Sequence, residues 1–221
     1  MKNPLIIAGL AGLVAALCAA CATPALAQSA DLQTWTAAGD VVLDNPGTAR
    51  LTTAYLDEAP LSAGAALLFD ALETALSLPA GSLAADTIEG SGLQLSFAAV
   101  AGTTLQFDWQ LSTVDFDPTQ ADRAFVLIDG GLLAPLGTVA PNSVSGHFSH
   151  SFAGAGTQAL AIVVMDVATA DRVSTLVVSN FSVSAVPEPG SWALLLAGLG
   201  VAGVAGAKRR RRMPTAAAGR R

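Results

Sequence analysis

Three aspartates near the middle of the chain have the chemistry of a calcium site. Asp115, Asp117 and Asp122 flank a proline within one short polar segment. Oxygen ligands on a loop are what calcium requires, although this spacing differs from the EF-hand loop, which needs acidic ligands at alternate positions and a distal glutamate. Asp166 and Asp171 flank another loop and could add ligands. Calcium binding is therefore one hypothesis, and solvated carboxylates in turns are the simpler alternative.

The two histidines offer a second place to look for chemistry. His147 and His150 are separated by three positions, which on a helix would bring both rings to one metal ion. Phe148 and Phe152 instead alternate with polar residues, as in a strand. Residues three apart in a strand project to opposite faces. We therefore predict that the histidines share no ion, and we assign no confident metal ligand.

Motifs of catalysis are missing from the sequence. There is no Gly-x-Ser-x-Gly elbow, and neither histidine has a recognisable partner. Glycine-rich phosphate loops are also absent. Cleavage of glycosidic bonds needs two carboxyl groups in a cleft, one of them with a raised pKa, and nothing in the sequence places two acids in that way. We predict that the protein is not an enzyme, with an undetected hydrolase as the last alternative.

Aromatic side chains could instead bind carbohydrate, because sugars stack on exposed rings. Trp35 and Tyr55 lie in irregular sequence, where we expect exposed rings. Trp109 follows the apolar face of a predicted strand and is expected in the core. A glycan platform on Trp35 and Tyr55 is therefore an alternative function, next to calcium binding.

Charge restricts the partners of the region between the two ends. Residues 28–186 carry three arginines, no lysine and sixteen acidic residues, a formal net charge of −13, although the whole chain reaches only −6. Nucleic-acid binding is disfavoured because it needs a cationic surface. A surface this acidic favours solubility and could attract divalent cations.

The elements that must position these residues are mostly strands. Apolar residues alternate with polar ones at 93–97 and 105–111, which indicates half-buried strands. Residues 125–128 and 160–165 are continuous apolar runs suited to central strands, and 176–183 forms the final strand. Glycine-containing breaks separate them. Residues 65–76 instead place Leu68, Leu72 and Leu76 at helical spacing, with Asp70 and Glu73 outward. We predict a mainly-β, jelly-roll-like antiparallel sandwich with one short helix.

The N-terminus has the pattern of a secretory signal peptide at residues 1–27. Lys2 precedes an apolar stretch, and Ala25 and Ala27 form a small-x-small cleavage site. The expected partners are the Sec translocon and signal peptidase. Lipidation at Cys21 is the alternative, although the residues before it form a poor lipoprotein box. Both cysteines, Cys18 and Cys21, fall inside this signal, so the mature domain would have neither disulfide nor thiolate chemistry.

The C-terminus combines three features in a fixed order. Pro187, Glu188 and Pro189 stop any preceding element and leave the backbone extended. The uncharged segment 191–207 is about the shortest that could span a ~30 Å hydrocarbon core as a helix. A basic cluster follows the C-terminal end of this segment and holds that end on the cytoplasmic side of the membrane. The cluster consists of Lys208, Arg209, Arg210, Arg211 and Arg212.

This tail resembles the PEP-CTERM sorting signal of Gram-negative envelope proteins. The resemblance implies processing by exosortase, a membrane-embedded cysteine transpeptidase or protease that acts near the Pro-Glu-Pro triplet, so Glu188 would be a recognition element. Residues 35–184 also look like the domain that recurs ahead of such tails, through the segments 87–93, 105–109 and 174–181. That second resemblance supports the prediction of a β-sandwich fold and implies no established activity.

These observations predict four parts: a signal peptide (1–27), a β-sandwich (28–185), a sorting signal with a transmembrane helix (186–212) and a cytoplasmic tail (213–221). The protein would pass through the inner membrane and reach the cell surface or the extracellular matrix. We predict a structural or adhesive role there, in contact with exopolysaccharide. The alternative is a carbohydrate- or calcium-binding module.

Overall fold

The computed structural model describes residues 31–83, 85–113, 120–139, 142–168, 172–184 and 197–200. All of its strands belong to one compact unit, residues 26–186. The turn of helix at 197–200 is outside that unit and is described by itself. The predicted cleavage site, the Pro-Glu-Pro triplet and the basic cluster lie outside the described residues, as do Asp115, Asp117 and Asp171.

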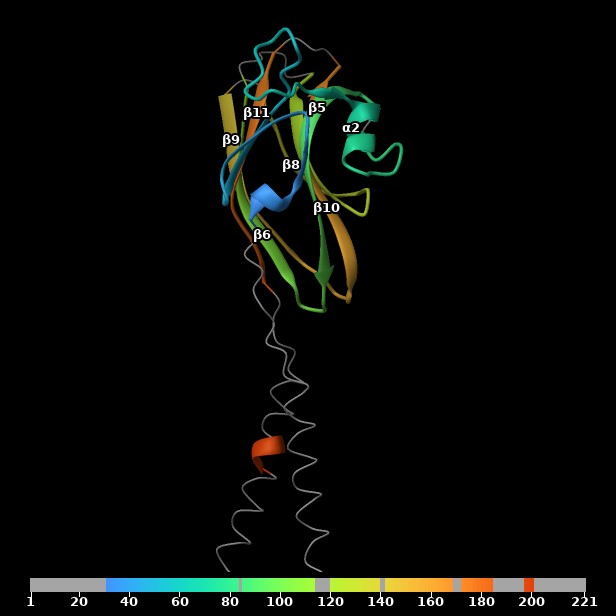
Figure 1. Cartoon of the computed structure of the whole chain (residues 1–221), viewed down its shortest axis with the longest axis vertical. Helices are drawn as coiled ribbons and strands as arrows, with labels where there is room; N and C mark the ends of the chain where they lie inside the picture. Colours follow the sequence, from blue (N-terminus) through green and yellow to red (C-terminus); the bar gives the residue numbers. More distant parts are fainter. Residues whose placement is uncertain are drawn as a thin grey trace, which may run out of the picture. The chain divides into compact units, whose positions relative to one another are not determined.

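Two antiparallel sheets make up the folded unit (Figure 1). The five-stranded sheet has the order β2 (Asp40–Asn45), β3 (Thr48–Thr52), β11 (Ser174–Ser184), β6 (Thr104–Thr113) and β9 (Asn142–Ser151). The six-stranded sheet has the order β1 (Thr36–Ala38), β5 (Thr87–Ala99), β10 (Gly156–Val167), β7 (Asp122–Ile128) and β8 (Gly131–Val139), and β4 (Leu67–Leu68) pairs with β5. A single 3-10 turn, η1 (Leu32–Thr34), precedes β1. The prediction of a mainly-β antiparallel sandwich is confirmed.

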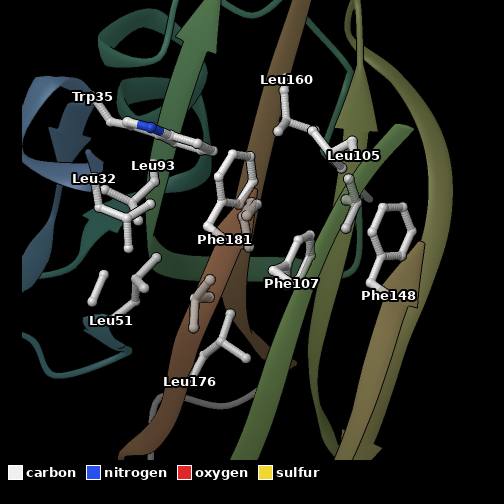
Figure 2. Packing of buried hydrophobic residues seen from close by; sticks show 14 of the residues in the cluster. Leu32, Trp35, Leu51, Leu93, Leu105, Phe107, Phe148, Leu160, Leu176 and Phe181 are labelled. Carbon is white, nitrogen blue, oxygen red and sulfur yellow. The ribbon is translucent and has the colours of Figure 1, made fainter. Parts of the chain in front are cut away.

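Alternation along the strands produces the interior, as predicted. In β6, Leu105, Phe107 and Leu111 are fully buried, whereas Gln106 and Gln110 are exposed. Figure 2 shows the Phe107 ring between Phe181 and Phe148, with which it stacks at centroid distances of 5.9 and 4.9 Å. The core between the sheets is therefore built from large side chains of facing strands.

The strands β10 and β7 are buried on both faces, because a second apolar cluster covers the outside of their sheet. Leu160, Ile162 and Val164 of β10 point into the sandwich, and Ala161 and Val163 point to the other side. There the helix α2 (Phe69–Ala75) adds Leu72 to the outer cluster (Figure 1). A strand covered on both faces needs a continuous apolar run, which is what the sequence showed.

The helix is shorter than the predicted span of residues 65–76. Leu67 and Leu68 form the short strand β4 instead, because they pair with Gly90 and Glu89 of β5. Leu68 is 48% exposed, so its predicted place on the apolar helix face is wrong. The prediction for Glu73 is also wrong. Its carboxylate is buried because it accepts hydrogen bonds from the backbone of Gly81 and Leu83, which holds the following loop against the helix.

Most of the predicted membrane-spanning segment lies outside the residues that the structure describes. Within the described residues, no helix is long and apolar enough to cross a membrane. Of the span at 191–207, only residues 197–200 are described, and they are helical.

Candidate functional site: a buried acidic end of the sandwich

One end of the sandwich interior is polar instead of apolar. Four carboxyl groups lie there at exposures of 3% or less: Asp40 of β2, Glu89 of β5, Asp122 of β7 and Asp166 of β10. Together with Ser174, the first residue of β11, we call this set the acidic end. Buried carboxyl groups are costly unless they are hydrogen-bonded, protonated or bound to a cation. How each group is accommodated therefore decides what this end can do.

Hydrogen bonds through Ser91 join the two sheets at the acidic end. The Ser91 hydroxyl on β5 accepts from the Asp40 backbone N–H at 2.8 Å and donates to the Thr52 carbonyl at 2.6 Å. In the register, Ser91 lies opposite Val164, two residues before Asp166. Thr52 lies opposite Thr175, next to Ser174. Asp166 on the six-stranded sheet and Ser174 on the five-stranded sheet therefore lie at the same end of the sandwich.

Asp40 is stabilised as a carboxylate. It accepts the backbone N–H groups of Leu61 and Ser62 at 2.8 and 2.7 Å, and a hydrogen bond from the Thr52 hydroxyl. Burial alone would raise the pKa of Asp40, but these hydrogen bonds outweigh it and hold the pKa below its ordinary value. The role of Asp40 is structural, because it fastens the loop around Leu61 onto the sandwich.

Glu89 is accommodated in the opposite way. Its Oε1 atom has no hydrogen-bond partner within the described part of the chain. Burial, with the negative charges of Glu58 and Asp57 nearby, raises the pKa of Glu89 to about 7. Glu89 therefore holds its proton through much of the acidic range and reaches half-ionisation near neutral pH.

Asp122 and Asp166 lie at the ends of neighbouring strands. Arg123 of β7 pairs with Met165 of β10 at the end of the printed register, and Asp122 and Asp166 are the next residues along each strand. The Asp122 carboxylate also accepts the Val167 backbone N–H at 3.3 Å. Both side chains point inward, since they continue the alternation of Ala124 and Val164 in the interior cluster. Both carboxyl groups are buried.

The described arginines are engaged elsewhere or are exposed. Arg50 makes an exposed ion pair with Asp44 at 2.8 Å, and Arg123 makes one with Asp86 at 2.7 Å. Arg172, the third arginine between residues 28 and 186, is exposed.

The structure places one of the three predicted calcium ligands, Asp122, at the acidic end. The sequence hypothesis for this trio is otherwise untested, because Asp115 and Asp117 are not described. Among the described residues, no three Asp, Glu, His or Cys side chains lie together so as to hold a metal ion. Asp166, which the sequence suggested as an additional ligand, is buried near the end of β10. Strand alternation continued from Ile162 would have placed it inside.

The two predicted glycan-binding aromatics differ in exposure. Trp35 is only 5% exposed, so its expected surface position is wrong. Its ring packs edge-on against Phe181 at 4.6 Å in the core (Figure 2). Tyr55 is 37% exposed, as expected, on a loop where Glu58 accepts its backbone N–H at 2.9 Å. Trp109 is partly buried at the margin of the core, against Gly146 of β9.

The histidines lie on β9 and project to opposite faces, as predicted, but His147 has a partner that the sequence did not reveal. Its Nδ1 atom lies 2.7 Å from Asp108 of β6, to which the Asn180 amide also donates at 2.8 Å. These hydrogen bonds, from Asn180 first and His147 second, lower the pKa of Asp108. Among the described residues, no serine hydroxyl is hydrogen-bonded to His147. The trio lies exposed on the outer face of its sheet.

A comparison with protein-family models decides the nature of the tail. The model of the PEP-CTERM protein-sorting motif matches residues 185–212. The chain carries a PEP-CTERM sorting motif. The PEP-CTERM motif is a signal that exosortase recognises, and it directs a protein through the membrane to the cell envelope and surface. The match confirms the resemblance drawn from Pro187, Glu188, Pro189 and the basic cluster.

Solved structures give distant likenesses to the chain. It is similar to the CBM51 of Clostridium perfringens GH95 solved in complex with methyl-galactose (13% identity, 68% of this chain, 94% of that chain, TM-score 0.31). The N-terminal cellulose-binding domain of Cellulomonas fimi β-1,4-glucanase C gives 15% identity, 68% of this chain, 97% of that chain and a TM-score of 0.33. No curated protein matches the chain.

An acetyl xylan esterase from Butyrivibrio proteoclasticus is similar over a smaller part (20% identity, 44% of this chain, TM-score 0.28). The chain spans about a quarter of the length of that esterase.

Proposed function

We propose that the protein is an exported, exosortase-processed component of the cell surface or exopolysaccharide matrix, where its folded domain has a structural or adhesive role. The PEP-CTERM motif at residues 185–212 carries this proposal. The proposed route is Sec export after cleavage behind Ala27, transit through the inner membrane with the basic cluster on the cytoplasmic side, and release from the tail by exosortase.

The chemistry of the sandwich supports a non-catalytic role. Its hydrogen-bonded acid Asp40 fastens a loop, and Glu73 fastens another. The exposed His147–Asp108 pair lies on an open sheet face, where a substrate would remain in water. Catalysis by proton transfer needs a site that positions its substrate. We therefore propose that the domain catalyses no reaction and instead serves as a stable structural or adhesive unit.

Processing of the tail is the direct test. In cells that contain exosortase, we expect mass spectrometry of the purified native protein to find a C-terminus near Pro187–Pro189, without the segment Lys208–Arg212. In cells lacking exosortase, the same protein should retain its basic end. A variant with Glu188→Ala should resemble the exosortase-free case, and Asp57→Ala, which replaces an exposed acid outside the motif, should be processed normally. A native protein that keeps its basic end in the presence of exosortase would contradict the proposal.

A carbohydrate-binding surface around Tyr55 is the second candidate. The observation that favours it is an exposed ring on the loop that also presents the carboxylates of Asp57 and Glu58, which can accept hydrogen bonds from sugar hydroxyls. If the full chain binds neutral exopolysaccharide, Tyr55→Ala should weaken binding about tenfold, the loss of one stacking contact of about 1.4 kcal/mol. The control is Leu132→Ala, which removes an exposed apolar side chain on β8. Absence of binding by the unaltered chain would reject this candidate.

A further inference from the structure

The strand β9 has a free edge. It pairs with β6 on one side, and within the described part of the chain no strand pairs with its other side (Figure 1). All of its residues except Phe148 and His150 are exposed. In an antiparallel pair, alternate residues direct their backbone N–H and C=O groups away from the partner strand. About five residues of β9 therefore present unpaired backbone donors and acceptors along this edge.

The other edge strands carry features that hinder pairing with a second chain, and β9 does not. In the six-stranded sheet, β1 and β4 are three and two residues long, and β8 contains Pro135 and two register shifts. In the five-stranded sheet, β2 carries Asp40, Asp44 and a register shift. Short strands, prolines, charges and bulges all oppose edge-to-edge pairing. By contrast, β9 follows β6 through ten register pairs without a shift and contains no proline, lysine, arginine, aspartate or glutamate.

The charge of the domain makes this edge the place where two copies can meet. Residues 28–186 have a formal net charge of −13, so two copies repel each other wherever their acidic side chains face. The outer face of β6 carries one acid, Asp108, whose carboxylate lies 2.7 Å from the Nδ1 atom of His147. His147 is the register partner of Asp108, so β9 lies between this carboxylate and the free edge. A second copy therefore meets an acid-free strand here.

Two copies of β9 also match each other by symmetry. The inward position of Phe148 leaves alternate residues on the outer face: Ser143, Ser145, His147, Ser149 and Ser151. Antiparallel pairing about a twofold axis perpendicular to the sheet keeps the outer faces of both copies aligned. The overlap is greatest with the axis at Gly146 or His147. In either register, Ser145 lies opposite Ser149 or His147 of the second copy, and hydroxyl pairs across strands stabilise a sheet.

From this arrangement we propose that the chain binds a second copy of itself through β9, by antiparallel pairing that joins the two five-stranded sheets into one continuous sheet. Backbone hydrogen bonds supply the affinity, as in other cases of strand addition to a sheet edge. The alternation of inward and outward side chains sets the register. The proposal gives the domain a structural contact of its own and is independent of the processing of the tail.

Sedimentation velocity of the purified full-length chain, in density-matched detergent and over a range of concentrations, tests the proposal. We expect reversible dimers that increase with concentration. Ser145→Lys combined with Ser149→Lys places like charges across the twofold axis and should weaken dimerisation about tenfold. The matched control combines Gln110→Lys with Gln106→Lys. These exposed residues of β6 are the register partners of Ser145 and Ser149, one strand away from the edge, so this variant should dimerise as the unaltered chain does.

Hydrogen exchange of the unaltered chain locates the contact without any substitution. The amides of residues 142–151 should gain protection as the concentration rises, whereas those of the edge strand β2 should not. Far-UV circular dichroism verifies that both lysine variants are folded. The proposal would be overturned by a chain that stays monomeric at every concentration or by protection of β9 that does not change with concentration. Equal dimerisation of the two lysine variants would also overturn it, because association through the tail predicts that result.

Discussion

Replacing Trp35 with alanine should lower the free energy of unfolding by about 3–5 kcal/mol, as large-to-small aromatic substitutions in cores do. The indole is buried between the sheets and packs edge-on against Phe181, which itself stacks on Phe107. Removal of the ring leaves a cavity in the largest aromatic cluster of the sandwich. Urea denaturation followed by far-UV circular dichroism measures this loss as a lower midpoint at an unchanged slope.

A conservative substitution provides the control for Trp35. The Nε1 atom of Trp35 is buried without a hydrogen-bond partner in the described region, so Trp35→Phe removes an unsatisfied donor while keeping an aromatic ring. We expect Trp35→Phe to cost clearly less than Trp35→Ala. A loss of sugar binding in folded Trp35→Ala, without a loss of stability, would contradict the buried position and restore Trp35 as a surface residue.

The second large effect is a change in pH dependence on replacing Glu89 with glutamine. Burial, with Glu58 and Asp57 nearby, raises the pKa of Glu89 to about 7, against an ordinary value of 4.5. Between these two pH values the folded chain holds a proton that the unfolded chain has lost. Stability therefore falls as pH rises from about 4.5 to 7, and this loss of stability persists above pH 7.

Glutamine keeps the shape of Glu89 without the charge. We expect Glu89→Gln to unfold at higher urea concentration than the unaltered chain at pH 8 and at nearly the same concentration at pH 4. The matched control is Glu73→Gln, which replaces a buried carboxylate that accepts two backbone hydrogen bonds, and which should destabilise at pH 8. Equal stability of Glu89→Gln and the unaltered chain at pH 8 would show that Glu89 is not held in a desolvated position.

Local alternation was sufficient to predict the sandwich but not the elements set by distant partners. The strands β6 and β10 follow from their own residues, because the period of apolar side chains is a local property. The short strand β4 was mistaken for part of a helix, since Leu67 and Leu68 take their conformation from pairing with β5. Helical spacing alone could not reveal this competition.

The candidate site was predictable in part for the same reason. Alternation continued from Val164 places Asp166 inside, but its neighbour Asp122 is distant in sequence and is brought there by register. Trp35 was assigned to the surface because it precedes any regular strand, yet its packing against Phe181 depends on the last strand. By contrast, the PEP-CTERM motif is read directly from contiguous residues and needed no fold.

The position of the last strand has a consequence for the timing of export. β11 ends at Ser184, immediately before the matched motif, and in its sheet it lies between β3 and β6. β3 and β6 can therefore complete their pairing only after β11 is present. On the proposed export route, the five-stranded sheet is finished only once the segment directly ahead of the sorting motif has crossed the membrane.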